Sequence, residues 1–431
     1  MESVIADVST GRYLLTAAAQ KLPQGRGKSA GWGPGGIFRL SGNEPEPMLP
    51  DAPGWVRLRP ELSGVCGSDI GAAHPKLSLV MSAIYRSARQ VPGHEIVAVV
   101  DQLGPGVTGL TEGDRVVVDP VMGCAIRGFD PVCRACRDGA PGVCERGSEP
   151  GITGHAAPCL GYDSPLGGGW AQQLVAHESQ LYPVGSIPSR RAVLAEPAAI
   201  GLHSALRWKR TGERAVVIGS GTIGLMTTAA LRMLYPDLDV IVLSDNDFGT
   251  AQALGAGATR VLRSGPAAVE ALAETDGGGL LWARMTKTPI LQRGVDAVFD
   301  CVGSSDTIDL ALHLLRTTGT LVLIGAAGKQ PVDWSLVWTR SITVAGTVMT
   351  GPEPALGRTS FSQVVEWLSD DAYPVDAIVT HTFPLEQWRT AMQTASAGPA
   401  AGCVKATLRP NPDIPLVTRA GGFERAEELV G

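Results

Sequence analysis

The chain has 431 residues, of which 44% are hydrophobic and 18% charged, and it carries a net charge of −6. This composition predicts a folded protein with material for more than one core, and it argues against intrinsic disorder. The acidic balance and the absence of a long apolar run exclude nucleic acid and membrane as expected partners. Because the first residues lack the basic-then-apolar order of a signal peptide, we expect a soluble, cytoplasmic protein.

The first part of the chain is predicted to be rich in strands. Residues 1–50 contain many Gly, Pro and polar residues and are expected to form a loose lead-in followed by short strands. Between 55 and 120, segments such as WVRLRP, EIVAVV and DRVVVDP alternate with turn residues, which is typical of an all-β unit. Residues 121–170 show no regular pattern and hold most of the cysteines.

The pattern changes near residue 190, where helix-like and strand-like segments begin to alternate. The apolar runs RAVVIG, DVIVLSD, GVDAVFDCVG and TLVLIGAAG are separated by helical stretches, one of them expected over 306–316. This alternation predicts a parallel, doubly wound sheet and an α/β protein. We therefore expect a β-rich domain (1–205) with an irregular lobe (121–150), a doubly wound domain (206–346), and a segment (347–431) that returns to the first domain.

The segment VVIGSGTIG contains the spacing G-x-G-x-x-G at Gly219, Gly221 and Gly224, after a predicted strand and at the start of a predicted helix. The first glycine permits a tight turn, the second lets a pyrophosphate approach the backbone, and the third lets the helix pack on the strand. Thr222 and Ile223 fall in the first helical turn, whose free N–H groups favour phosphate. The motif therefore predicts a dinucleotide site.

Two further segments belong to this predicted site. Asp245 ends the next strand, in DVIVLSD, and its carboxylate is expected to bind the adenosine ribose. Because a carboxylate repels a 2′-phosphate, NAD(H) is favoured over NADP(H). Cys301 and Val302 follow the strand GVDAVFD and are expected near the nicotinamide, where they would contribute backbone groups.

Closely spaced cysteines in the irregular lobe predict a structural metal site. Cys133, Cys136 and Cys144 follow one another at short intervals in a Gly/Pro/Arg-rich stretch, and tetrahedral zinc could fold such a lobe. The fourth ligand could be Cys124 or Asp130. A zinc finger that binds nucleic acid has the same spacing, but the acidic chain offers no basic patch for phosphates.

A second metal site is suggested by residues that lie far apart in the sequence. Cys66 stands in GVCGSD, His94 and Glu95 stand in GHE, and Glu196 stands in AEP. Thiolate, imidazole and carboxylate are the ligands of a catalytic zinc that keeps one position open. Taken singly, each residue also has a structural explanation, such as a small buried thiol or a helix start.

Together, GVCGSD, VPGHEIVAVV, the cysteine lobe, LAEPAAIGLHSA, VVIGSGTIG and VFDCVG resemble, in this order, the zinc-dependent medium-chain dehydrogenase/reductase family. The resemblance spans roughly residues 36–410. It implies a GroES-like β-rich catalytic domain and a Rossmann domain, with the active site in the cleft between them. It also implies that the protein forms a homodimer or homotetramer.

The resemblance assigns roles to single residues. Cys66, His94 and Glu196 would bind the catalytic zinc, and Glu95 would exchange on and off the metal or stand just behind it. Asp69 matches the acid that fixes the metal-bound imidazole, and Ser68 matches the hydroxyl that relays the substrate proton. These assignments are implied by the family and do not follow from spacing.

The chain departs from the family pattern at several positions. The first cysteine of the family's lobe is Asp130 here, and we expect Cys124 to take its place, because four thiolates suit a structural zinc. The position of the family's relay histidine is Gly71, with His74 nearby. The stretch after Asp245 is shorter than is usual in the family. The loop 75–90 is longer, and we expect it to change the shape of the substrate pocket.

The expected activity is zinc-dependent hydride transfer between an alcohol and a ketone or aldehyde, with a nicotinamide cofactor as the partner. One alternative is zinc-independent reduction of an activated C=C bond by NAD(P)H on the same scaffold. A non-catalytic binding protein is a third possibility, because fold alone does not set function. The substrate is expected to be a small alcohol or carbonyl compound.

Overall fold

The computed structural model describes residues 1–20, 31–33, 35–74, 79–277, 279–285, 287–419 and 423–424. The chain divides into two compact units, the first made of 1–196, 349–370 and 379–431 and the second of 197–348 and 371–378. The boundary between the two units falls at Glu196–Pro197, earlier in the chain than the expected boundary at residue 205. Residues 371–378 belong to the second unit, whereas the expected layout places them in the segment that returns to the first domain. Among the described residues, no helix has the length and apolar character needed to span a bilayer.

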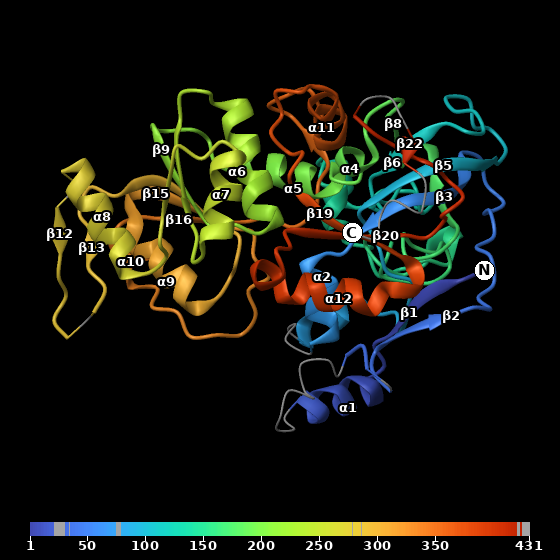
Figure 1. Ribbon diagram of the computed structural model, residues 1–431, viewed down its shortest axis with the longest axis horizontal. Coiled ribbons are helices and arrows are strands. Elements are labelled where there is room, and N and C mark those ends of the chain that lie inside the picture. The colour runs from blue at the N-terminus through green and yellow to red at the C-terminus, as the bar shows by residue number, and fades with distance from the viewer. Residues whose placement is uncertain are drawn as a thin grey trace. The chain divides into compact units, whose positions relative to one another are not determined.

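The first unit is built mainly from strands (Figure 1). Its strands are β1 Ser3–Asp7, β2 Phe38–Ser41, β3 Trp55–Gly64, β4 Arg89–Gln90, β5 Ile96–Leu103, β6 Arg115–Val118, β7 Leu174–His177, β8 Leu181–Pro183, β17 Pro352–Glu353, β18 Arg358–Thr359, β19 Val379–Pro384, β20 Lys405–Arg409, β21 Leu416–Val417 and β22 Phe423–Glu424. Its helices are α1 Thr10–Gln20, α2 Gly67–Ala73, α3 Arg134–Arg137, α4 Ser189–Ala192, α11 Ser360–Ser369 and α12 Trp388–Ala397, and α5 Ala195–Leu206 begins here.

A seven-stranded sheet carries this unit, with the order β19-β20-β3-β5-β6-β8 and with β7 also paired to β3. Strand β3 pairs antiparallel with β5, β7 and β20. Alternate residues of these strands, such as Val56 and Leu58, are buried in the core of the sheet. Because β20 comes from the C-terminal segment, the end of the chain completes the sheet that the first half begins.

The N-terminal region is more ordered than its composition suggested. Strand β1 pairs with β2 and β4, and Val4, Ile5 and Ala6 are all buried. The following residues, TGRYLLTAAAQ, form helix α1 because they are mostly good helix formers, whereas the Gly- and Pro-rich composition comes from residues after Gln20. Residues 75–78 of the long loop lie outside the described residues, and β4 follows its remainder.

The second unit is a doubly wound α/β structure. Its strands are β9 Arg214–Ile218, β10 Asp239–Leu243, β11 Arg260–Leu262, β12 Leu280–Leu281, β13 Ile290–Leu291, β14 Val295–Asp300, β15 Leu315–Leu323 and β16 Thr343–Gly346, and its helices are α6 Thr222–Leu234, α7 Asp247–Gly255, α8 Pro266–Asp276, α9 Ser305–Leu314 and α10 Ser335–Thr339. Six strands form a parallel sheet in the order β11-β10-β9-β14-β15-β16. This is the 3-2-1-4-5-6 order of a Rossmann fold, and the expected helix over 306–316 is α9.

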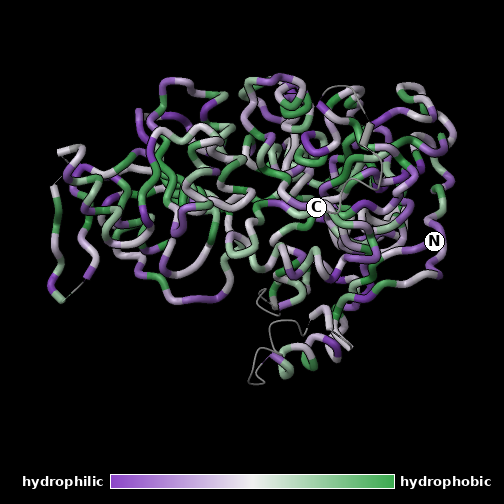
Figure 2. The backbone as a smooth tube through the Cα atoms, in the orientation of Figure 1, coloured by the Kyte–Doolittle hydropathy of each residue, from purple (hydrophilic) through white to green (hydrophobic). Residues whose placement is uncertain are grey.

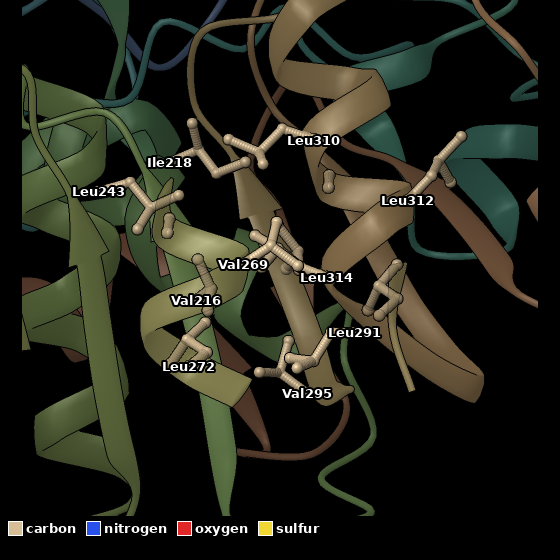
Figure 3. Packing of buried hydrophobic residues seen from close by; sticks show 14 of the residues in the cluster. Val216, Ile218, Leu243, Val269, Leu272, Leu291, Val295, Leu310, Leu312 and Leu314 are labelled. Atoms are coloured by element: carbon tan, nitrogen blue, oxygen red, sulfur yellow. The ribbon is translucent and has the colours of Figure 1, made fainter. Parts of the chain in front are cut away.

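The core of this unit lies between the sheet and the helices that cover it. Val216 and Ile218 leave β9 on the same face, because side chains two residues apart in a strand point the same way. They pack with Val269 of α8 and Leu310 and Leu314 of α9 in one buried cluster (Figure 3). The strands of the sheet are correspondingly apolar along their length, as the green segments in Figure 2 show.

Candidate active site and metal centres

Cys66, His94 and Glu95 come together at one end of the β-rich sheet. Cys66 lies between the end of β3 and the start of α2, and His94 and Glu95 directly precede β5, which pairs with β3. One ligand atom from each side chain lies within 4.8 Å of the other two. The antiparallel pairing of the two strands therefore places a thiol, an imidazole and a carboxylate within reach of a single ion.

The residues around Cys66 explain how this arrangement is held. The backbone N–H of Cys66 donates to Asp69 Oδ2 at 2.9 Å, so the carboxylate closes the first turn of α2. A Cβ at position 64 would lie 1.7 Å from Glu95 Oε2, so the first residue of GVCGSD must be glycine. The backbone N–H of Gly64 also donates to the Glu95 carbonyl at 2.9 Å.

The electrostatics of this group suit a cation. Burial, together with the charge of Glu95, raises the pKa of the Cys66 thiol to about 11. Burial also raises the pKa of Asp69. His94 is buried, and among the described residues its Nδ1 has no hydrogen-bond partner. A divalent ion would favour the thiolate and give the donor set a partner, so these residues fit a catalytic zinc.

Glu95, a member of this group, is also held by a lysine. Lys405 Nζ, from β20, donates to both Glu95 carboxylate oxygens at 2.6 and 2.7 Å and to the Val65 carbonyl at 3.1 Å. Both side chains are almost completely buried, with 3% and 1% of their surface exposed. Burial alone would lower the pKa of Lys405, but attraction from Glu95 and Cys66 outweighs this effect and raises the pKa overall.

Glu196 lies outside the close group but near its charges. It is the second residue of α5 and is buried. Burial raises the pKa of its carboxyl to about 8, and this rise is opposed by His94 and increased by Glu95 and Cys66. The set of residues whose ligand atoms lie within 4.8 Å of one another contains Glu95 in place of Glu196.

Ser68, in the first turn of α2, has a partner that the sequence did not indicate. The Tyr162 hydroxyl donates to Ser68 Oγ at 2.8 Å. The Tyr162 ring lies beside His94, with 5.3 Å between ring centroids, and beside Tyr85, with 4.8 Å. Burial raises the pKa of Tyr162 well above its usual value, so its phenol stays protonated and remains a donor.

The cysteine lobe forms a second, self-contained group. Cys124, Cys133, Cys136 and Cys144 have ligand atoms within 4.8 Å of one another. Cys144 Sγ lies 3.5 Å from Cys124 Sγ and 3.8 Å from Cys133 Sγ. Backbone N–H groups of Cys124, Cys133 and Cys136 donate to neighbouring sulfur atoms at 3.3–3.5 Å. Burial tends to raise the pKa of Cys133, but backbone N–H groups that donate to its sulfur lower this pKa to about 6. Four thiols in this arrangement fit a tetrahedral structural zinc.

The structure distinguishes between the two residues considered for the fourth position. Cys124 is buried within the group, whereas Asp130 is exposed and is not part of it. The buried Arg127 guanidinium ties this stretch to the rest of the lobe by donating to the carbonyls of Met122, Glu149, His155 and Ala157. The turn between Cys124 and Cys133 therefore has its own anchor.

The glycine motif forms the turn between β9 and α6. Gly219 has φ 104°, a conformation that side-chain-bearing residues rarely adopt. A Cβ at Gly224 would lie 1.9 Å from the Gly219 carbonyl oxygen, whereas one at Gly221 would meet nothing within 4 Å. The turn is therefore closely packed at Gly224 and has free space at Gly221. Thr222 and Ile223 are the first two residues of helix α6. This cradle fits a pyrophosphate.

The remaining residues of the predicted dinucleotide site lie around this turn. Cys301 N–H donates to the Ile218 carbonyl at 3.1 Å, and Val302 Cγ2 would lie 3.0 Å from a Cβ on Gly219. Asp245 is exposed just after β10, the strand next to β9. A second carboxylate follows at Asp247, which binds Arg263 at 2.5 Å.

Two family models match the chain in the order of its domains. The Alcohol dehydrogenase GroES-like domain matches residues 52–186, and the Zinc-binding dehydrogenase model matches 222–370. The chain belongs to the zinc-dependent medium-chain dehydrogenase/reductase family. The observed β-rich and Rossmann units confirm the fold expected of this family.

Curated relatives of the chain include dehydrogenases of polyols, of butanediol and of L-threonine. The chain is 29% identical over 304 residues to (R,R)-butanediol dehydrogenase of Saccharomyces cerevisiae, covering 67% of this chain and 73% of the relative. It is 26% identical over 336 residues to L-idonate 5-dehydrogenase of Vitis vinifera, covering 77% and 81%. It is 26% identical over 362 residues to sorbitol dehydrogenase of Arabidopsis thaliana, covering 81% and 88%.

Solved structures share the fold at lower identity. Galactitol-1-phosphate dehydrogenase from Escherichia coli superposes with a TM-score of 0.68 at 20% identity, covering 95% of this chain and all of the other. An alcohol dehydrogenase from Escherichia coli CFT073, solved with NADH, gives a TM-score of 0.67 at 23% identity, covering 86% and 96%. At these identities the likeness shows the fold alone.

Three residues of the site carried no signal in the sequence. Lys405 stands in VKATLR, a strand with ordinary alternation, and it reaches Glu95 across 310 positions. Tyr162 reaches Ser68 across 94 positions. Arg127 stands among the cysteines, and its burial follows only from the carbonyls that surround it.

Proposed function

We propose that the protein catalyses reversible hydride transfer between a small alcohol and the corresponding ketone or aldehyde, with NAD(H) as the second substrate. The observation that carries this proposal is the group of Cys66, His94 and Glu95, in which the imidazole Nδ1 has no hydrogen-bond partner among the described residues. The same chain also has the glycine turn of a dinucleotide site. A zinc ion held there would polarise the substrate oxygen, and the nicotinamide would accept or return the hydride.

Metal binding, support of the metal ligands and proton transfer are assigned to different side chains of the chain. Cys66 and His94 would hold the metal, with Glu196 as a third ligand or a partner through water, and Asp69 would fix the local geometry through α2. Glu95 would stand behind the metal in its pair with Lys405. Ser68 would pass the substrate proton between the substrate oxygen and solvent.

The cofactor preference rests on the charges beyond β10. Asp245 and Asp247 follow β10, at the strand end beside which we expect the adenosine ribose, and Arg263 is paired with Asp247. A 2′-phosphate would meet net negative charge there, so NADH should bind more tightly than NADPH. Zinc-independent reduction of a C=C bond is not favoured, because it leaves the Cys66 group without a role.

Cys66→Ser tests the proposal. Activity with a panel of alcohols, ketones and enones should fall at least about 10³-fold in kcat/KM, because several kcal/mol of Lewis-acid stabilisation would be lost. NADH binding, followed by fluorescence, should change little. Cys403→Ser, in a buried cysteine outside both groups, is the matched control. Retained activity in the Cys66 variant, or enone reduction that survives it, would contradict the assignment.

A further inference from the structure

The hydroxyl of Ser68 contacts one of three neighbouring aromatic side chains, Tyr162. Tyr162 O–H donates to Ser68 Oγ at 2.8 Å, and the Tyr162 ring contacts the rings of both His94 and Tyr85. Ser68 comes from α2 and His94 from the start of β5, while Tyr162 lies in the stretch before β7. The phenol thus reaches, from a third segment, the same side chain to which we assign the substrate proton.

His74 is also close to Ser68 in the sequence, but its contacts indicate a structural role. His74, which follows α2, has its Nδ1 at 2.9 Å from Gln20 Nε2 of α1, and its ring meets Trp32 edge-on at 5.0 Å. It therefore anchors the N-terminal region to the end of α2. Ser68 Oγ instead accepts a hydrogen bond from Tyr162, and the Ser68 side chain also hydrogen-bonds the Cys66 thiol.

The geometry of a hydroxyl makes this contact directional. Ser68 Oγ has one proton to donate and two lone pairs to accept with. When the Tyr162 O–H occupies one lone pair, the proton of Ser68 must point elsewhere, and the Ser68 side chain hydrogen-bonds the Cys66 thiol. The proton of Ser68 is therefore directed toward the metal ligands, where a substrate oxygen would have to bind. The contact also places a donor against Oγ at the moment when Ser68 gives up its proton and gains negative charge.

We propose that Tyr162 is a positioning residue for proton transfer, which orients Ser68 and stabilises its oxygen through the Tyr162–Ser68 hydrogen bond. The inference rests on the proposed function. In carbonyl reduction the hydride adds to carbon, the Ser68 O–H bond breaks as the substrate O–H bond forms, and Ser68 Oγ regains a proton from solvent. Tyr162 keeps its own proton throughout, and alcohol oxidation runs through the same steps in reverse.

Tyr162→Phe removes the hydroxyl and keeps the ring against His94 and Tyr85. We expect kcat to fall about tenfold, the scale of one hydrogen bond to a charged oxygen, with KM little changed. The solvent deuterium isotope effect on kcat should increase, because the proton step becomes slower. Tyr85→Phe, which removes the hydroxyl of the neighbouring ring, should stay within about twofold of the wild type.

A double-mutant cycle separates action through Ser68 from a general packing effect. If Tyr162 acts through Ser68, then Ser68→Ala with Tyr162→Phe should be no slower than Ser68→Ala alone. Additive losses in the double variant, an unchanged isotope effect, or an equal loss in Tyr85→Phe would overturn the proposal. Metal content and the visible spectrum of the cobalt-substituted enzyme should be the same in Tyr162→Phe and wild type, and a changed spectrum would place the effect at the metal site.

A spectroscopic measurement tests the hydrogen bond without turnover. The Raman Fermi doublet of Tyr162, obtained as wild type minus Tyr162→Phe, should shift in Ser68→Ala because the acceptor is lost. An unshifted doublet would overturn the Tyr162–Ser68 contact and leave the proposed function intact. Absence of NADH-linked turnover in the wild type with every alcohol and carbonyl tried would instead overturn the proposed function, and the role of Tyr162 with it.

Discussion

The group around Cys66 and the cysteine lobe lie in the same β-rich unit, but they are built in different ways. The lobe gathers four thiols within a stretch of 21 residues, and its sulfur atoms receive backbone N–H bonds from the same stretch. The Cys66 group draws mixed ligands from two strand ends and is surrounded by further charges, namely Asp69, Lys405 and Glu196. A closed set of four thiolates suits a metal that only folds the chain, whereas a mixed and incomplete set leaves a position for substrate.

The difference extends to how each group is supported. The lobe is held from inside by Arg127, which binds backbone carbonyls and needs no acidic partner. The Cys66 group is held by a buried ion pair and by helix α2, so its support depends on charges that a metal or substrate can alter. We therefore expect the lobe to determine stability and the Cys66 group to determine activity.

The largest effect on stability is expected at Cys124. Cys124→Ser should remove one zinc per chain and lower the free energy of unfolding by several kcal/mol, because a structural zinc contributes directly to folding. Metal analysis and urea denaturation measure both effects. Asp130→Asn, the control, should leave zinc content and stability near those of the wild type. The reverse result would assign the fourth position to Asp130.

A smaller loss is expected when the buried pair behind His94 is broken. Lys405→Met leaves the Glu95 carboxylate buried without its partner and should destabilise the protein by roughly 3–5 kcal/mol. Adding Glu95→Gln removes the uncompensated charge, so the double variant should recover a large part of the loss. Chemical denaturation at matched zinc content is the measurement. A double variant no more stable than Lys405→Met would show that the pair is not coupled.

The smallest of these effects is a pH dependence near the lobe. His155 is fully buried with Nε2 at 2.9 Å from the Cys159 carbonyl, and burial lowers its pKa from 6.5 to about 4. Between these values the unfolded chain binds more protons than the folded chain, so stability should fall as the pH drops from 6.5 to 4, by up to about 3 kcal/mol. His155→Gln should remove this part of the dependence. If the stability of the variant and of the wild type fell equally with pH between 6.5 and 4, at equal zinc content, the assignment to His155 would be contradicted.

Much of the fold follows from local patterns in the sequence. Alternating strands, the glycine motif and the strand–helix rhythm predict a β-rich unit and a Rossmann sheet, because each depends on residues close together in the chain. The N-terminal region was less predictable. Its glycines and prolines suggested a loose segment, but the buried side chains of β1 and the helix formers of α1 lie ahead of most of them.

The site was predictable only where ligands fall into motifs. Cys66 and His94 stand in recognisable segments, and the strand pairing of β3 with β5 explains why they meet. Lys405 and Tyr162 meet their partners through tertiary packing, across 310 and 94 residues, and no spacing encodes such contacts. The position of Cys124 also depended on the three-dimensional turn, because spacing alone left Asp130 as an alternative.

The most direct test of the account is the zinc content per chain of protein purified without added zinc or chelator, compared with that of Cys66→Ser and Cys124→Ser. We predict two zinc ions in the wild type and one in each variant. A single zinc in the wild type that Cys124→Ser removes would contradict the catalytic metal and, with it, the proposed chemistry. No zinc in a folded protein that binds NADH would contradict both sites.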